Sequence, residues 1–231
     1  MTALRAVVFD LYDTVVFVDP VHRERHQEDL AKRLGLPPDL FLAHWRGTGR
    51  ASNLGTIGPT EDRFREVIAR GGAPRADLGE LAATEHAFLR AAAKPVSGIR
   101  ALLRELRSGG VRLGLLSNCS ASVSFTLEAA GFRDAFDAVS LSCETGLAKP
   151  DPRFFRRLLA ELDVEPAAAL YVADGVDGEL EAAEQVGMTA VRAAWANPGG
   201  SAHPRIPVAT SVDALSRIIA GRRAESAAGA P

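Results

Sequence analysis

Hydrophobic residues follow two different spacings along the chain, and these divide it into two parts. Residues 6–9 form a short unbroken apolar run, which is typical of a strand buried on both faces of a parallel sheet. From about residue 18 to residue 94 the pattern is instead helical, without a clear strand. Four helices are predicted in this stretch, at residues 21–34, 38–46, 60–70 and 76–93, with a glycine-rich loop at residues 46–59.

The rest of the chain alternates between strand-like and helix-like segments. The predicted strands are residues 111–116, 136–141, 168–173, 189–193 and 207–209. The predicted helices are residues 97–108, 121–130, 151–162, 179–186 and 212–220. This order indicates right-handed crossover connections and a parallel sheet with helices on both faces.

The predicted fold is therefore α/β, with a doubly wound (Rossmann-like) parallel sheet as the core and an inserted all-helical cap domain. Residues 1–17 and 95–220 are assigned to the core, and residues 18–94 to the cap. Residues 221–231, which are rich in alanine and end in Gly-Ala-Pro, are predicted to form a flexible tail.

Composition and charge exclude several classes of function. The chain has 231 residues, of which 47% are hydrophobic and 24% charged, as is ordinary for a soluble globular protein. A net charge of −2 gives no attraction for nucleic acid or acidic membranes, and no apolar run is long enough to span a bilayer. The N-terminus shows no secretory signal, and the two cysteines suggest a reducing compartment. We therefore expect a cytoplasmic protein, monomeric or homodimeric, that acts on a small molecule.

Polar side chains follow several of the predicted strands. Asp10 ends the first strand, Ser117 and Asn118 follow the second, Asp174 follows the fourth, and Lys149 precedes a helix. In a doubly wound sheet the carboxyl ends of the strands converge on one crevice. Each residue alone also suits a turn, a helix cap or the surface. Together they suit a bound phosphate or carboxylate, because two acids can hold Mg²⁺ and one of them can act as a nucleophile.

Four segments resemble, in order, the four motifs of the haloacid dehalogenase (HAD) superfamily of hydrolases. They are FDLYDT at residues 9–14, LSN at 116–118, KPD at 149–151 and YVADG at 171–175. The predicted helical insert resembles the mobile cap of that superfamily, so the resemblance covers residues 5–220.

The resemblance implies a role for each matching residue. Asp10 would be the nucleophile that forms a covalent aspartyl ester. The carboxylates of Asp10 and Asp174 and the backbone carbonyl of Tyr12 would bind Mg²⁺. The residues implied to hold the transferring group are Thr14, Ser117 and Lys149, and Asn118 belongs to the same catalytic set.

Two departures from the phosphatases of this superfamily stand out. Those enzymes carry a leaving-group acid two residues after the nucleophile, where this chain has Tyr12. Asp13 lies one residue later and is not assigned that role, because neighbouring residues leave a strand in opposite directions. The phosphatases also carry an acid where this chain has Gly178, and whether the flanking Asp177 or Glu179 supports the metal is left open.

Tyr12 is also what the 2-haloacid dehalogenases of the superfamily carry, and those enzymes use no metal. They have uncharged polar residues, however, where this chain has Asp174. Asp10 and Asp174 facing each other would cost several kcal/mol if buried without a cation. The favoured function is therefore an Mg²⁺-dependent phosphatase for a small phosphorylated metabolite. The alternatives are a 2-haloacid dehalogenase-type hydrolase and a catalytically weak protein that binds a phosphorylated ligand.

The cap is expected to set the substrate specificity. Arg46 and Arg50 flank the predicted glycine-rich loop and could clamp an anionic substrate, and Tyr12 would also contact it. Without an acid at position 12, we expect a good leaving group or a proton from the cap. Phosphonate cleavage is a related alternative, for which Lys32 is the only early cap lysine. Cys119 is interpreted as a small buried thiol.

Overall fold

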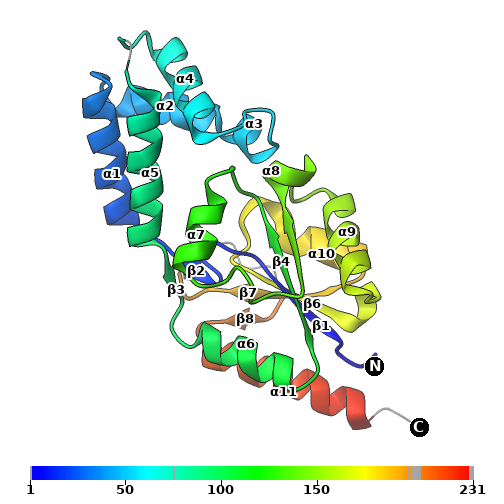
Figure 1. The fold of residues 1–231 in the computed structure, drawn as a ribbon. Coiled ribbons are helices and arrows are strands. Elements are labelled where there is room, and N and C mark those ends of the chain that lie inside the picture. Colours follow the sequence, from blue (N-terminus) through cyan, green and yellow to red (C-terminus); the bar gives the residue numbers. More distant parts are fainter. Residues whose placement is uncertain (1, 75, 197, 199–203, 229–231) are drawn as a thin grey trace.

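Six parallel strands form the central sheet, in the order β5-β4-β1-β6-β7-β8 (Figure 1). The computed structural model describes residues 2–74, 76–196, 198 and 204–228. The strands are β1 (Ala6–Phe9), β4 (Arg112–Ser117), β5 (Ala138–Leu141), β6 (Ala169–Ala173), β7 (Thr189–Ala193) and β8 (Val208–Ala209). This arrangement confirms the predicted α/β class and the parallel sheet.

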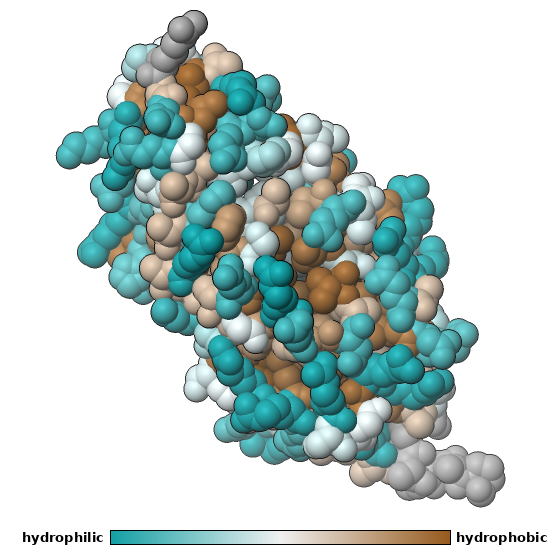
Figure 2. All heavy atoms as spheres, viewed as in Figure 1, coloured by the Kyte–Doolittle hydropathy of each residue, from teal (hydrophilic) through white to brown (hydrophobic). Residues whose placement is uncertain are grey.

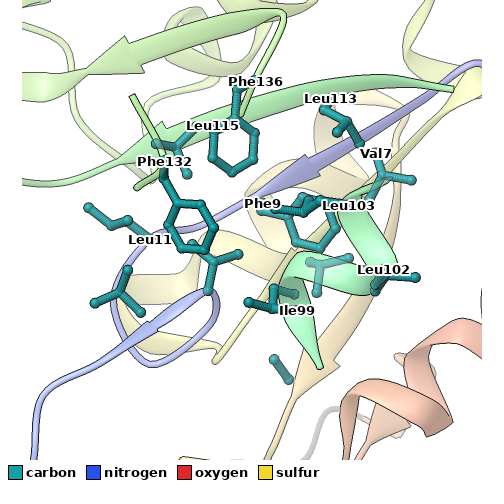
Figure 3. Packing of buried hydrophobic residues seen from close by; sticks show 14 of the residues in the cluster. Val7, Phe9, Leu11, Ile99, Leu102, Leu103, Leu113, Leu115, Phe132 and Phe136 are labelled. Atoms are coloured by element: carbon teal, nitrogen blue, oxygen red, sulfur yellow. The ribbon is translucent and has the colours of Figure 1, made fainter. Parts of the chain in front are cut away.

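Side chains of the central strands alternate between two hydrophobic layers, as the period of a strand requires. On β1, Val7 and Phe9 join the layer under α6 (Ile99–Ser108) and α11 (Val212–Ala228), as Figure 3 shows for residues of β1, β4 and α6. Ala6 and Val8 face the opposite layer, which contains side chains of α9 (Pro152–Leu162) and α10 (Glu179–Val186). Helices therefore cover both faces, and the carboxyl ends of the strands stay available for a site.

Five helices between β2 and β3 form a separate group beyond the carboxyl end of the sheet (Figure 1). They are α1 (Pro20–Arg33), α2 (Pro38–Gly47), α3 (Gly49–Asn53), α4 (Thr60–Gly71) and α5 (Leu78–Ala92). They have a hydrophobic cluster of their own, in which Leu30, Phe41 and Phe64 are fully buried. The prediction of a loop through residues 46–59 is wrong at α3, a single short turn of helix that glycine at its first position did not suggest.

Two short strands connect the helical group to the core. β2 (Val16–Phe17) and β3 (Lys94–Pro95) pair antiparallel, so the chain leaves and re-enters the core at neighbouring points. A third short element, α8 (Ser142–Thr145), follows β5. The sequence pattern did not predict β2, β3 or α8.

The last helix is longer than predicted. α11 continues through Ala228, so the expectation of a flexible tail from residue 221 is wrong for residues 221–228, and residues 229–231 lie outside the described residues. Arg223 donates a hydrogen bond to the carbonyl oxygen of Gly109 at 3.1 Å, which ties this extension to the core. The surface shown in Figure 2 is mainly hydrophilic, with hydrophobic atoms visible between the polar side chains. Within the described residues, no helix is both long and apolar enough to cross a membrane.

Candidate active site

Three buried carboxylates and one buried lysine meet at the carboxyl ends of β1 and β6. One oxygen each of Asp10, Asp174 and Glu179 lie within 4.8 Å of one another. The Nζ atom of Lys149 lies 2.5 Å from an oxygen of Asp10 and 2.5 Å from an oxygen of Glu179. All four residues line one cavity of about 160 Å³.

Neighbouring strands place two of these acids. Asp10 directly follows β1, and its backbone N–H donates to the carbonyl oxygen of Val172 at 2.9 Å, which continues the β1–β6 ladder. Asp174 directly follows β6. Because β1 and β6 are adjacent and parallel, both carboxylates leave the sheet at the same edge.

Glu179 is the acid that the sequence pattern left open. It is the first residue of α10, is 1% exposed, and accepts hydrogen bonds from the Tyr171 hydroxyl at 2.7 Å and the Gly175 N–H at 3.2 Å. Gly178, directly before α10, adopts a left-handed backbone with φ of 69°, a conformation that favours glycine. The side chain of Asp177 lies outside the described residues.

The charges of these four groups do not cancel. When all are ionised, the three carboxylates outnumber the single ammonium group, and the cluster carries a net charge of −2. Burial and, to a smaller extent, the neighbouring Glu179 raise the pKa of Asp174 to about 6. Burial also raises the pKa of Asp10, while Lys149 acts against it and favours the carboxylate. Oxygen ligands, burial and this excess of negative charge fit one divalent cation such as Mg²⁺.

Two predicted site residues carry buried hydroxyl groups without a partner. The side-chain oxygens of Thr14 and Ser117 make no hydrogen bond with any described residue, and both residues are fully buried. The side chain of Asn118, in contrast, has hydrogen-bond partners. It donates to the carbonyl oxygen of Lys149 at 3.0 Å and accepts from the N–H of Lys149 at 2.8 Å. Asn118 therefore holds the backbone from which the lysine side chain reaches Asp10.

Tyr12 and Asp13 both line the cavity of Asp10. The Tyr12 hydroxyl pairs with the hydroxyl of Thr126 at 3.1 Å, and burial raises the pKa of Tyr12, so the phenol stays neutral. Asp13 adopts a left-handed backbone with φ of 57°. The strict alternation that we expected after Asp10 therefore does not continue beyond β1, and both residues line the same cavity.

A larger space of about 730 Å³ lies between the cap and the core. Arg50 and Asn53 of α3 line it from the cap, and Asn118 and Lys149 line both this space and the cavity of Asp10. Among the described residues that line either space, Arg46 does not occur, although it was predicted to bind substrate together with Arg50. Arg46 is exposed near the end of α2.

Lys32, the residue on which the phosphonate-cleavage alternative depends, lies in the last turn of α1 and is exposed. Within the described part of the chain, it is absent from the residues that line the two spaces. The position gives no support to an imine-forming lysine at this site.

Comparisons with known proteins agree on a family. A model of the haloacid dehalogenase-like hydrolases matches residues 4–187. A haloacid dehalogenase-like hydrolase domain-containing protein 3 from Bos taurus is 35% identical over 103 residues, which are 45% of this chain and 41% of that protein. A phosphoserine phosphatase from Thermus thermophilus is 35% identical over 165 residues, which are 70% of this chain and 64% of that protein. The chain thus spans less than two thirds of the length of these relatives.

Solved structures share the fold. A HAD-family enzyme from Bacteroides thetaiotaomicron, an Asp-to-Ala mutant in complex with magnesium and inorganic phosphate, has a TM-score of 0.66 at 20% identity and covers 86% of this chain and 97% of its own. An L-2-haloacid dehalogenase has a TM-score of 0.67 at 22% identity and covers 95% of this chain and 100% of its own. At these identities the likeness establishes the fold.

Proposed function

The chain belongs to the haloacid dehalogenase-like hydrolase family, and we propose that it is an Mg²⁺-dependent phosphatase for a small phosphorylated metabolite. The observation that carries this proposal is the cluster of Asp10, Asp174 and Glu179 around Lys149, with its excess of negative charge. A dehalogenase would have to bind the carboxylate of a haloacid beside these acids, and their charge would repel it. A phosphoryl group with a divalent cation balances the same charge.

In this proposal each residue of the site has a distinct task. Asp10 attacks the phosphorus atom in line with the leaving group and forms an aspartyl phosphate, which water then hydrolyses. Lys149 favours the carboxylate form of Asp10 and contributes positive charge to the phosphoryl oxygens. The unpaired hydroxyls of Thr14 and Ser117 donate hydrogen bonds to these oxygens.

The acids around Lys149 would hold the metal ion. Asp10, Asp174 and Glu179 offer the carboxylate oxygens, with the Tyr12 backbone carbonyl as a further ligand. When bound there, Mg²⁺ would neutralise negative charge on the transferring group. The relative from Thermus thermophilus is a phosphoserine phosphatase, and the enzyme from Bacteroides thetaiotaomicron was solved with magnesium and inorganic phosphate, which supports both parts of the proposal.

The leaving group must depart without a proton from position 12. The Tyr12 phenol is weakly acidic and is engaged with Thr126. A general acid contributes roughly 10²- to 10⁴-fold to the rate, so we expect aryl, enol or acyl phosphates to react much faster than alkyl phosphates. Equal rates for an aryl and an alkyl phosphate would contradict this part of the proposal. Arg50 in the space beside Lys149 is proposed to bind an anionic group on the substrate.

A 2-haloacid dehalogenase remains the second candidate, because Tyr12 lines the cavity of Asp10. One panel separates the candidates: p-nitrophenyl phosphate, an alkyl phosphate and 2-chloropropionate, each assayed with Mg²⁺ and with a chelator. We expect phosphate release that requires Mg²⁺ and is lost in Asp10→Asn. Halide release that is unaffected by the chelator would overturn the proposal. Tight phosphate binding without turnover would instead indicate the catalytically weak binding protein.

A further inference from the structure

The two cysteines of the chain follow adjacent parallel strands that both lead to the active site. Ser117 of β4 pairs in register with Leu141 of β5. Cys119 lies two residues after Ser117, and Cys143 lies in α8, two residues after Leu141. Neighbouring strands lie about 4.8 Å apart, and a disulfide bond requires its two Cα atoms to be about 4.4–6.8 Å apart.

The side chain of Ser142 joins the two segments beyond the ends of the strands. The Ser142 hydroxyl accepts from the backbone N–H of Cys119 at 2.9 Å and donates to the carbonyl oxygen of Cys119 at 3.3 Å. Cys119 belongs to the hydrophobic layer under α6, and Cys143 packs against that same layer. The two side chains therefore point to the same face of the sheet, as a disulfide bond needs.

The two thiols also differ in pKa and in burial. A hydrogen-bonding interaction between them lowers the pKa of Cys143 and, together with burial, raises the pKa of Cys119. Cys143 is only partly buried, whereas Cys119 is 3% exposed. Cys143 is therefore the thiol that an oxidant reaches first and in the more reactive form.

We propose that Cys119 and Cys143 form an oxidation site, at which a peroxide produces a reversible intramolecular disulfide bond. The Cys143 thiolate attacks one peroxide oxygen, the O–O bond breaks, and a sulfenic acid forms with release of water. The Cys119 sulfur then attacks the Cys143 sulfur, the S–O bond breaks, and the hydroxide leaves as water with the proton of Cys119. Two thiols are oxidised, and one molecule of hydrogen peroxide is reduced to two of water.

The position of this pair connects it to the site. Cys119 directly follows Asn118, which holds the backbone of Lys149. On the other side, the carbonyl oxygen of Cys143 lies 2.2 Å from where a Cβ atom on Gly55 of the cap would stand, so the cap packs closely against α8. A bond between the two sulfurs would fix the loop after β4 against the turn on which the cap rests. Oxidation is therefore expected to slow turnover, a consequence that rests on the proposed function.

The test uses the full chain, reduced, desalted and treated with hydrogen peroxide, followed by alkylation and intact-mass measurement. We expect the oxidised chain to take up no alkyl group, to have lost two hydrogen atoms, and to give a cross-linked peptide with both cysteines. Dithiothreitol should restore two alkylation sites. Cys143→Ser should remain monomeric with Cys119 free at the same peroxide dose, and Cys119→Ala should accumulate sulfenic or sulfinic acid at Cys143.

The outcomes separate the two claims. Two free thiols after treatment, or two independently oxidised ones, would overturn the oxidation site. The mass readout needs no turnover, so it decides this claim even if the protein proves not to be a phosphatase. If the reduced chain hydrolyses p-nitrophenyl phosphate, its rate should fall on oxidation and recover with dithiothreitol, and Cys143→Ser should be insensitive. A disulfide bond with an unchanged rate would overturn the effect on turnover.

Discussion

Thr14 and Ser117 each bury a hydroxyl group that has no hydrogen-bond partner among the described residues. A buried unsatisfied polar group costs roughly 1–3 kcal/mol of stability, so two of them in one crevice favour a ligand that supplies the missing acceptors. Thr14 follows Asp13 and Ser117 precedes Asn118, and both of these neighbours line the cavity of Asp10, so phosphoryl oxygens bound there are the acceptors that we propose. Thr14 and Ser117 themselves are not among the described residues that line this cavity.

We predict that Ser117→Ala separates stability from activity. The free energy of unfolding should stay unchanged or rise by up to about 1 kcal/mol, because the substitution removes an unsatisfied group. The value of kcat/KM for p-nitrophenyl phosphate should fall about 10- to 100-fold, as expected for a lost hydrogen bond to a charged group. Urea unfolding and steady-state kinetics measure the two effects.

Ser140→Ala is the matched control, since Ser140 on β5 buries an equally unpaired hydroxyl but, unlike Ser117, is not adjacent in the chain to a residue that lines the cavity of Asp10. It should show the same small change in stability with normal kinetics. A Ser117→Ala variant that is both less stable and fully active would contradict the proposed role.

Tyr171→Phe tests how Glu179 is held. The substitution removes only the hydroxyl that donates to Glu179 at 2.7 Å. Partners that orient a metal ligand are typically worth 10- to 100-fold in metal affinity. We therefore expect Mg²⁺ affinity, measured by titration calorimetry, to fall about 10-fold. The control is Phe155→Leu, which alters the ring packed against Tyr171. In this variant stability should fall and Mg²⁺ affinity should stay unchanged. Unchanged Mg²⁺ affinity in Tyr171→Phe would contradict the proposal that Tyr171 orients Glu179.

Among single residues, the sequence predicted Asp10 and Asp174 at the strand ends better than Glu179, the acid at the start of α10. Asp10 and Asp174 directly end buried apolar runs, so the strand pattern alone fixes where they lie. Glu179 depends on a left-handed glycine at position 178 and on where α10 begins, and neither has a periodic signature. Arg46 is not among the described residues that line either space, and its role in substrate binding stays a prediction.

Between elements, the cap packs closely against the core at Gly55. An added Cβ atom would stand 2.2 Å from the carbonyl oxygen of Cys143, a distance that side chains do not tolerate. Gly55→Ala should therefore displace the cap from α8. We expect a several-fold higher KM for phosphate esters, with a loss of roughly 1 kcal/mol or more in the free energy of unfolding.

Gly35→Ala is the control for the backbone strain that any non-glycine residue would carry at such a position. Gly35 has nearly the same left-handed φ, 64° against 70°, and nothing within 4 Å of an added Cβ atom. It should lose stability through strain alone and keep the normal KM. An equal rise of KM in both variants would show that the contact with Cys143 is unimportant.

A histidine lies where α5 meets α7 (Val123–Ala129). His86 stacks on Phe125 at 3.8 Å between ring centroids and pairs with the Thr60 hydroxyl at 2.8 Å. Burial lowers the pKa of His86 below its usual value of 6.5, although neighbouring acids act against this. The charged groups that face it are Glu61, Glu85 and Arg90.

We predict that this contact weakens in mild acid. Because the pKa is lower in the folded state, the unfolded chain takes up the proton first as the pH falls, so stability decreases from about pH 6.5 downward until the folded protein is protonated too. The free energy of unfolding should drop more steeply between about pH 7 and pH 5.5 in the parent protein than in His86→Gln. Parallel pH profiles would show that His86 does not contribute.

Most of the long helices and the five-residue strands repeat their pattern over several positions, and the sequence placed them within a few residues. The helix α11 is the exception, because it extends well beyond its predicted end at residue 220. β2 and β3 exist only because they pair with each other, which no local pattern reveals. The extension of α11 depends on tertiary contacts such as that of Arg223 with Gly109.

For the whole molecule, the unbalanced charge of the site predicts a link between metal binding and stability. The folded protein gathers three carboxylates that the unfolded chain keeps apart, so Mg²⁺ should bind the folded state selectively. At a free concentration about 100 times the dissociation constant, such binding stabilises a protein by about 2.7 kcal/mol. We expect the melting temperature to rise by several degrees with Mg²⁺ and to return with a chelator.

Charge removal at the cluster distinguishes this effect from a general salt effect. Asp174→Asn removes one negative charge from the cluster and one candidate ligand. The metal-free variant should therefore be at least as stable as the parent, and Mg²⁺ should raise its melting temperature only slightly. Asp163→Asn, a surface change outside the cluster, should respond to Mg²⁺ as the parent does. If Na⁺ at equal ionic strength stabilised the parent as strongly as Mg²⁺, or if Asp174→Asn kept the full response, the cluster would not be a divalent-cation site. The charge argument for a phosphatase over a dehalogenase would then no longer hold.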